Sequence, residues 1–202
     1  MPAVALAVAA SSVPRRTVVT EAVAIPAHRR TIALVGLMGV GKSTVGRRLA
    51  RRLSLPFSDA DGEIEAAAGM TVSDIFSELG EPEFRAGESR VIKRLLEGPR
   101  MVLATGGGAM LNPDTRAVLK ARAVTVWMRA DLETVASRVQ RRDTRPLLRG
   151  RDPLQALKAM AEVRYPFYAC ADVVVDVASG AHAEAVEGIV RALEAYWTEG
   201  AV

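Results

Sequence analysis

The stretch GLMGVGKST, which covers residues 36–44, matches the pattern G-x-x-x-x-G-K-[ST]. In this pattern the glycines let successive backbone N–H groups converge on a phosphate without obstruction by a Cβ atom. Lys42 would reach the β and γ oxygens of a nucleoside triphosphate, and the hydroxyl of Ser43 would bind the accompanying Mg²⁺. The stretch therefore predicts a phosphate-binding loop (P-loop) for a nucleotide.

The residues on either side of the loop supply the context that this motif requires. Residues 31–35 form an apolar run that predicts a buried strand, and the amphipathic stretch 42–53 predicts a helix. Such a helix would aim the positive end of its dipole at the bound phosphate. A strand, a glycine-rich turn and a helix in this order favour a functional loop over a chance glycine turn.

Strands and helices alternate along the rest of the chain. We expect four further short strands, near residues 57–58, 101–105, 124–128 and 173–177. The expected helices fill about 61–97 with breaks near Gly69 and Gly80, and others begin at Asn112-Pro113, at Asp131, at Pro153 and before a last stretch that ends near Trp197. This alternation predicts an α/β fold, in which a parallel five-stranded sheet is flanked by helices on both faces.

The composition is that of an ordinary globular protein, with 202 residues of which 50% are apolar and 25% charged. One cysteine and two histidines exclude an intramolecular disulfide and a zinc site rich in these residues. No apolar run reaches the ~18 residues that a membrane span requires. The apolar stretch within residues 1–30 lacks a preceding positive charge, which argues against a secretory signal. We expect residues 1–30 to be a flexible extension and residues 31–202 to form one domain.

The formal net charge of +4 is unevenly distributed. Residues 1–30 carry +3, and residues 138–151 carry +5 from six arginines and one aspartate. By contrast, residues 31–137 carry only +1 and residues 152–202 carry −5. None of the nine aromatic residues lies within 138–151, where bases would need rings to stack on. The pattern favours a local anion site over a nucleic-acid-binding face.

Two carboxylates, Asp59 and Asp61, follow the second predicted strand, at the edge of the sheet where α/β proteins bind ligands. Alternate residues that leave a strand point to opposite sides, so one carboxylate could face Mg²⁺ and the other an acceptor. Alternatively, Asp61 could cap a helix. The strand 101–105 ends in three glycines, 106–108, where many P-loop proteins have a metal-binding acid. Asp59 is therefore the candidate metal ligand, and the glycines allow a ligand to approach the backbone closely.

With these motifs the sequence closely resembles the shikimate kinases, small P-loop kinases of the nucleoside monophosphate kinase type. The resemblance covers about residues 31–197 and rests on the stretch 36–44, the Asp59/Asp61 pair, Asp74-Ile-Phe with Gly80-Glu-x-x-Phe84-Arg85, Gly106-Gly107-Gly108, Arg145-Pro-Leu-Leu148 and Glu162-x-Arg164-x-Pro-x-Tyr168. It implies a P-loop NTPase fold of the nucleoside monophosphate kinase-like class, with a helical region that binds the acceptor and a mobile lid at about 140–152. It also implies transfer of a phosphoryl group from ATP to the 3-hydroxyl of shikimate, a step of chorismate and aromatic amino acid biosynthesis.

For the acceptor, the resemblance implies that Asp61 binds the hydroxyl groups of shikimate and either orients the attacking hydroxyl or accepts its proton. Arg85, Arg164 and the backbone of Gly107 would bind the substrate, with the two arginines on its carboxylate. A planar guanidinium group matches a carboxylate in shape and charge. Taken alone, each arginine would more often lie on a solvated helix face.

For the nucleotide, the resemblance implies three catalytic residues, Lys42, Asp61 and Arg145. Arg145 would close over the phosphates from the lid. Arg138 is our candidate for the contact with adenine, and Arg141 is the alternative because the spacing within the lid varies in this family. The implied ATP-binding residues are Gly39, Val40, Gly41, Lys42, Ser43, Thr44, Arg138 and Arg145.

The resemblance also implies Mg²⁺ as the cofactor, held by Ser43 and, through water, by Asp59. Two other functions are compatible with a P-loop: a kinase for another small acceptor, such as gluconate kinase, and a nucleotide-binding regulatory module. The Arg85/Arg164 pair and the triple glycine favour shikimate. We expect a cytoplasmic monomer that binds ATP and shikimate, with no nucleic-acid partner and no membrane association.

Overall fold

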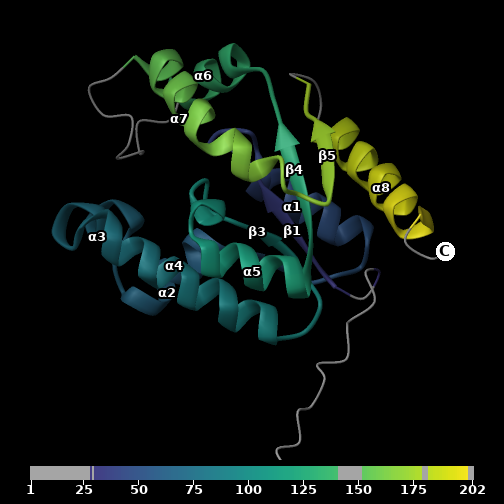
Figure 1. The fold of residues 1–202 in the computed structure, drawn as a ribbon, viewed down its shortest axis with the longest axis horizontal. Helices are drawn as coiled ribbons and strands as arrows, with labels where there is room; N and C mark the ends of the chain where they lie inside the picture. The colour runs from purple at the N-terminus through teal and green to yellow at the C-terminus, as the bar shows by residue number, and fades with distance from the viewer. Residues whose placement is uncertain (1–27, 29, 141–151, 179–181, 200–202) are drawn as a thin grey trace, which may run out of the picture.

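The computed structural model describes residue 28 and residues 30–140, 152–178 and 182–199 (Figure 1). Nearly all of the expected extension and lid, including Arg141 and Arg145, lie outside these residues. The strands are β1 (Thr31–Val35), β2 (Phe57–Asp59), β3 (Val102–Ala104), β4 (Ala123–Arg129) and β5 (Val173–Asp176). The helices are α1 (Lys42–Arg52), α2 (Ala60–Ala68), α3 (Val72–Glu78), α4 (Gly80–Glu97), the short 3-10 helix η2 (Ala109–Leu111), α5 (Pro113–Arg122), α6 (Leu132–Gln140), α7 (Pro153–Tyr168) and α8 (His182–Glu199).

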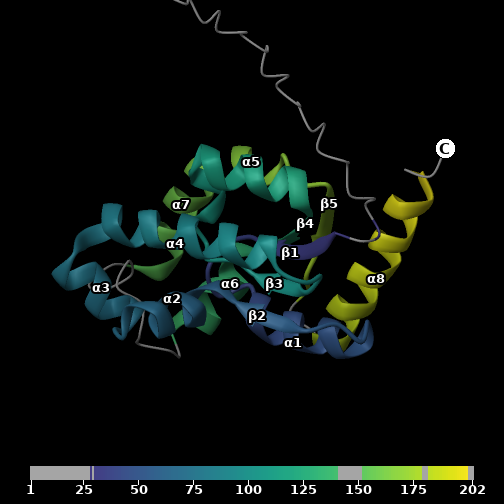
Figure 2. The same cartoon turned by 90° about the horizontal axis from the view of Figure 1, so that it is seen from below.

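The five strands form one parallel sheet in the order β2-β3-β1-β4-β5. Parallel neighbours need crossover connections, which the helices supply. Figure 2 shows α5 and α7 on one side of the sheet and α1 and α8 on the other. The predicted α/β fold with a parallel five-stranded sheet is therefore confirmed.

The central strand β1 explains why the sheet is covered on both faces. All five of its side chains are buried, and its neighbour β4 is buried over all but its last residue. Ile32 pairs with Val102 on one side and with Val124 on the other, so apolar side chains fill both layers of the core. An apolar run without alternation is typical of such doubly covered parallel strands.

Local signals mark the ends of several helices, as the sequence predicts. Gly69 ends α2 in the left-handed conformation, with φ 65°, and Gly80, with φ 84°, separates α3 from α4. Asn112 caps α5, because its side chain accepts the N–H groups of the second and third helical residues, and Pro113 occupies the first position. The two glycines turn the chain between α2, α3 and α4, which follow one another as one connected helical segment.

Helices α2, α3 and α4 pack together beside the sheet around a small apolar cluster of their own (Figure 1). The cluster consists of Ile64, Ile75, Phe84 and Val91, and the rings of Phe76 and Phe84 lie 4.7 Å apart. The helices that the sequence predicts over about residues 61–97 are therefore present in this segment. None of the described helices combines the length and apolarity that crossing a bilayer requires.

Candidate active site

A cavity of about 340 Å³ lies at the carboxyl ends of β1, β2 and β3. The structure brings most of the sequence-predicted residues to it: Gly39, Gly41, Lys42, Ser43, Thr44, Asp59, Asp61, Gly107 and Arg138 line the cavity, together with Met38, Thr105, Val139 and His182. Val40 is buried in the core instead, so only its backbone is available to a ligand in the loop. The cavity occupies the position where α/β proteins bind their ligands.

The P-loop holds its lysine inside the protein. Gly41 is the N-cap of α1 in the left-handed conformation, with φ 96°, and no side chain caps the first turn of the helix. The side chain of Lys42 is buried, and its Nζ donates to the carbonyl oxygens of Gly36 at 2.8 Å and Leu37 at 2.9 Å. A helix N-terminus and a partly desolvated ammonium group thus share one concave site, which attracts an anion.

Asp59 and Asp61 both line the cavity but differ in their local roles. Asp59 ends β2 and caps α2, because its Oδ1 accepts the N–H of Asp61 at 3.2 Å. The alternative in which Asp61 caps the helix is therefore wrong: Asp61 lies in the first turn, one position after the helix has begun. Asp59 therefore makes the capping bond, and Asp61 lines the cavity from the first turn of α2.

The triple glycine after β3 makes room for polar groups that come from other elements. A Cβ atom on Gly106 would lie 2.1 Å from Oε1 of Glu88 and 3.1 Å from Oδ1 of Asp61. A Cβ atom on Gly108 would lie 2.3 Å from Cζ of Arg85. Side chains from α2 and α4 therefore occupy the space that a Cβ atom at Gly106 or Gly108 would need.

We expect Gly106→Ala to destabilise the protein and Gly62→Ala to leave its stability unchanged or slightly higher. The added methyl of Gly106→Ala collides with the buried carboxylate of Glu88, which should lower the free energy of unfolding by about 1–3 kcal/mol. Gly62 lies in α2, where a Cβ atom meets nothing within 4 Å. Alanine at this position should therefore raise the free energy of unfolding by about 1 kcal/mol or less. Urea denaturation of both variants checks this, and equal stabilities would contradict the crowding at Gly106.

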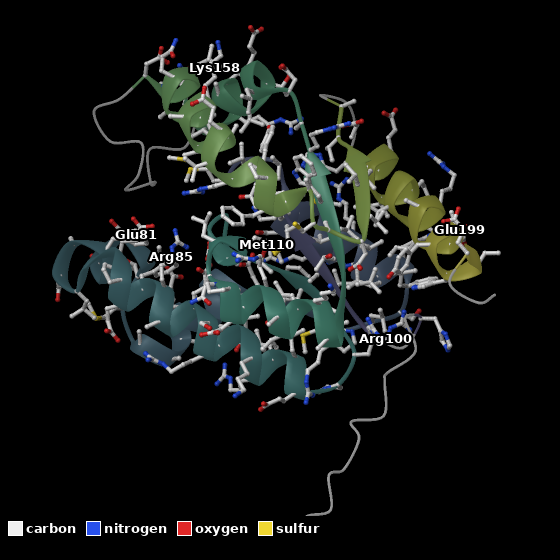
Figure 3. All side chains as sticks on the ribbon, in the orientation of Figure 1. Glu81, Arg85, Arg100, Met110, Lys158 and Glu199 are labelled. Atoms are coloured by element: carbon white, nitrogen blue, oxygen red, sulfur yellow. The ribbon has the colours of Figure 1, made fainter. Side chains whose placement is uncertain are left out.

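Arg85 and Arg164 do not lie on solvated helix faces. Arg164 of α7 is 6% exposed, and its Nη1 donates to the carbonyl oxygen of Gly107 at 3.2 Å. Arg85 of α4 donates from Nη1 to Oε2 of Glu88 at 2.8 Å and from Nη2 to Oε1 of Glu81 at 3.0 Å. Figure 3 shows Glu81 and Arg85 together on α4. Both guanidinium groups thus reach the glycine loop, although they come from helices far apart in the sequence.

Glu88 belongs to the site, although the sequence motifs did not single it out. It is 2% exposed, and its Oε1 has no hydrogen-bond partner among the described residues. Burial raises the pKa of Glu88 and the negative charge of Asp61 adds to this, whereas the positive charge of Arg85 opposes it. The one available signal was the spacing of three residues from Arg85 on a predicted helix, which allows an ion pair.

Replacing Glu88 by glutamine should change how stability depends on pH. A glutamate titrates near 4.5 in the unfolded chain, and the raised pKa means that the folded protein holds the proton more tightly. The stabilising contribution is therefore complete below the unfolded pKa and is lost as the pH rises through the folded pKa. The free energy of unfolding of the wild type, minus that of Glu88→Gln, should therefore fall as the pH rises above about 4.5. A constant or rising difference in urea denaturation would contradict the raised pKa.

His182 lines the cavity, although no motif in the sequence indicated it. It begins α8, and its Nε2 would lie 3.9 Å from a Cβ atom on Gly41. Burial lowers the pKa of His182, and the positive charges of Arg48 and Arg138 lower it further, so the neutral imidazole is favoured. Arg138, near the end of α6, also lines the cavity. The contact joins segments far apart in the chain, so no local pattern could have predicted it.

Comparison with known proteins gives a consistent result. A sequence model for "Shikimate kinase" matches residues 38–194. The shikimate kinase of Caulobacter vibrioides (strain NA1000 / CB15N) is 60% identical over 168 residues, which cover 83% of this chain and 84% of that protein. The shikimate kinase of Paramagnetospirillum magneticum (strain ATCC 700264 / AMB-1) is 57% identical over 147 residues, with 73% and 75% covered. Among solved structures, the shikimate kinase from Acinetobacter baumannii in complex with shikimate has a TM-score of 0.80 and 36% identity, covering 84% of this chain and 95% of that one.

Proposed function

Because the chain belongs to the shikimate kinase family, whose members phosphorylate the 3-hydroxyl of shikimate with ATP, we propose which of its residues carry out the reaction. One observation supports the assignment above all. The glycine loop 106–108 lies against Asp61 from α2, Arg85 from α4 and Arg164 from α7, and Gly107 also abuts the P-loop, where its Cβ position is 3.2 Å from the backbone nitrogen of Met38. The acceptor groups and the phosphate loop therefore form one continuous site.

The acceptor is a monocarboxylate with three hydroxyl groups, and the site offers a partner for each kind of group. Arg85 and Arg164 bind the carboxylate, since two guanidinium groups satisfy both of its oxygens through charge-assisted bonds. The backbone of Gly107 binds the substrate beside these two arginines. Asp61 binds the hydroxyl groups at the end of the site nearer the P-loop, which separates the reacting hydroxyl from the carboxylate.

Phosphoryl transfer needs positioning and neutralisation of charge more than it needs a strong base. Lys42 neutralises the charge that develops on the β and γ oxygens, and Arg145, outside the described residues, adds a second charge from the lid. Asp61 orients the attacking hydroxyl, because a loose transition state requires little removal of its proton. The catalytic residues are thus Lys42, Asp61 and Arg145.

The nucleotide occupies the P-loop side of the cavity. Its phosphates bind the amides of residues 39–44 at the N-terminus of α1. Its adenine lies against Arg138, which lines the cavity and is close enough to His182 for its charge to lower the pKa of that histidine.

Mg²⁺ fits the oxygen donors that this cavity contains. The hydroxyl of Ser43 and the carboxylate of Asp59 both line it, and Mg²⁺ is commonly held by one or two such groups together with phosphate oxygens and water. Ser43 would hold the ion directly and Asp59 through water. When bound, the ion would neutralise charge on the phosphates.

We further propose that the protein acts as a cytoplasmic monomer without a nucleic-acid partner. The P-loop, Asp61, Gly107 and Arg164 meet within a single chain, so the proposed site needs no residue from a second copy. ATP as the co-substrate supports the cytoplasm. The near-neutral charge of residues 31–137 supports the absence of a nucleic-acid partner.

The assay that tests this function is ADP release from ATP and Mg²⁺ with one acceptor at a time. Shikimate should give a kcat/KM at least about a hundredfold above that of gluconate or a nucleoside monophosphate, because gluconate is a flexible open chain that must be ordered on binding and a nucleoside monophosphate has no carboxylate for the two arginines. Equal rates with gluconate would support the other small-acceptor kinase. ADP release that no acceptor stimulates would support a regulatory nucleotide-binding module.

A further inference from the structure

Tyr168 lies next to the site at the end of α7 and has no role in the reaction as described above. It is 1% exposed, and its ring packs near Trp127 and Tyr165 at centroid distances of 5.9 Å and 6.3 Å. Its hydroxyl donates to the carbonyl oxygen of Gly107. Burial raises the pKa of Tyr168 to about 12, so the hydroxyl stays a neutral donor throughout the usual assay range.

The same carbonyl oxygen accepts a second hydrogen bond, from Nη1 of Arg164 at 3.2 Å. Tyr168 follows Arg164 by four positions, so both side chains leave the same face of α7. A carbonyl oxygen has two lone pairs and can accept both donors at once. Arg164 is also the group proposed to bind the substrate carboxylate. A guanidinium group has five N–H donors, so Arg164 can donate to that carboxylate while Nη1 keeps its bond to Gly107, and the Gly107 carbonyl then fixes Arg164 beside the substrate.

The orientation of the peptide between Gly107 and Gly108 decides which hydrogen-bonding groups the glycine loop presents to a substrate. In a trans peptide the carbonyl of Gly107 and the N–H of Gly108 point in opposite directions, and the described chain has no cis peptide bond. Because Arg164 and Tyr168 bind the Gly107 carbonyl from α7, the Gly108 N–H points away from α7. Within the described parts of the chain, neither that N–H nor the N–H of Gly107 donates to a protein acceptor. Both donors are thus available to a ligand.

We propose that Tyr168 is a positioning residue, whose hydroxyl holds the peptide between Gly107 and Gly108 in place while Arg164 binds the carboxylate of the substrate. Tyr168 does not touch the substrate and acts only through Gly107. The inference rests on the proposed function, because it requires Arg164 and the glycine loop to bind shikimate. The proposed role predicts that loss of the Tyr168 hydroxyl weakens the binding of shikimate and leaves the binding of ATP unchanged.

The test compares Tyr168→Phe with Tyr165→Phe. The first change removes a hydroxyl bonded to Gly107 and keeps the buried ring. The second removes a hydroxyl from a neighbouring tyrosine on the same helix, for which the described residues provide no hydrogen-bond partner. Tyr168→Phe should raise the KM for shikimate about five- to tenfold, the effect of one lost neutral hydrogen bond, with kcat and the KM for ATP within about twofold. Tyr165→Phe should leave all three constants within about twofold.

A merely structural role gives a different result. If Tyr168→Phe changed kcat and both KM values together, or left the KM for shikimate unchanged, the inference would be overturned. Titration calorimetry of shikimate binding to the wild type and both variants distinguishes a failure of the proposed function from a failure of the role assigned to Tyr168. A wild type that binds shikimate but does not phosphorylate it would contradict the proposed function alone. Equal shikimate affinities of the wild type and Tyr168→Phe would contradict the inference alone.

Discussion

Replacing Lys42 by methionine should lower kcat about a hundred- to a thousandfold, which is the usual loss when a preorganised charge is removed from a transition state. Lys42 is buried and fixed by bonds to the carbonyl oxygens of Gly36 and Leu37, so its charge is in place before the reaction begins. Methionine keeps most of the length of the side chain and removes only the ammonium group. The measurement is kcat for ADP release at saturating shikimate and ATP.

The matched control is Lys120→Met. Lys120 is an exposed lysine near the end of α5, next to the start of β4 and therefore at the opposite edge of the sheet from the cavity. Its replacement should change kcat by less than about twofold. A Lys42→Met protein that binds ATP and keeps kcat within about tenfold of the wild type would show that the P-loop lysine does not stabilise the transition state.

Replacing Arg164 by alanine should raise the KM for shikimate about a hundredfold or more, because the substrate loses a pair of charge-assisted hydrogen bonds in a buried setting. The KM for ATP should change by less than about threefold, since Arg164 contacts the glycine loop and not the P-loop cradle. Arg122→Ala, which removes an exposed arginine at the end of α5, should leave both constants unchanged. Steady-state kinetics with each substrate varied in turn separates the two constants.

A neutral substrate shows whether charge recognition is the cause. The wild type should prefer shikimate to its carboxamide, and Arg164→Ala should lose most of that preference. If Arg164→Ala left the KM for shikimate unchanged, or kept the full preference for the carboxylate, the assignment of Arg164 to the carboxylate would be wrong.

The sequence predicted those features that depend on residues close together in the chain. The P-loop, the five strands and the cap at Asn112 are examples, because spacing and residue type determine them locally. The exception is the start of α2. Asp61 was one candidate for its cap, but β2 ends at Asp59 and the helix begins immediately, so the first carboxylate takes the capping bond.

Features that depend on packing between distant elements could not be predicted in the same way. Nothing near Glu88 in the sequence indicates that its carboxylate fills the space beside Gly106. His182 reaches the P-loop from the start of α8. Tyr168 belongs to a recognised motif, but its bond to Gly107 appears only when α7 is placed against the loop after β3. In each case a loop without side chains allows a distant polar group to come close.

Phosphorus NMR of the product formed from ATP and shikimate locates the transferred phosphate. With the wild-type protein we expect a single phosphate ester, coupled to the proton on carbon 3, in amounts equal to the ADP formed. This result follows if the arginines hold the carboxylate while Asp61 orients the 3-hydroxyl towards the P-loop. A phosphate on another hydroxyl, or ADP formed without any phosphate ester, would contradict this arrangement of the site.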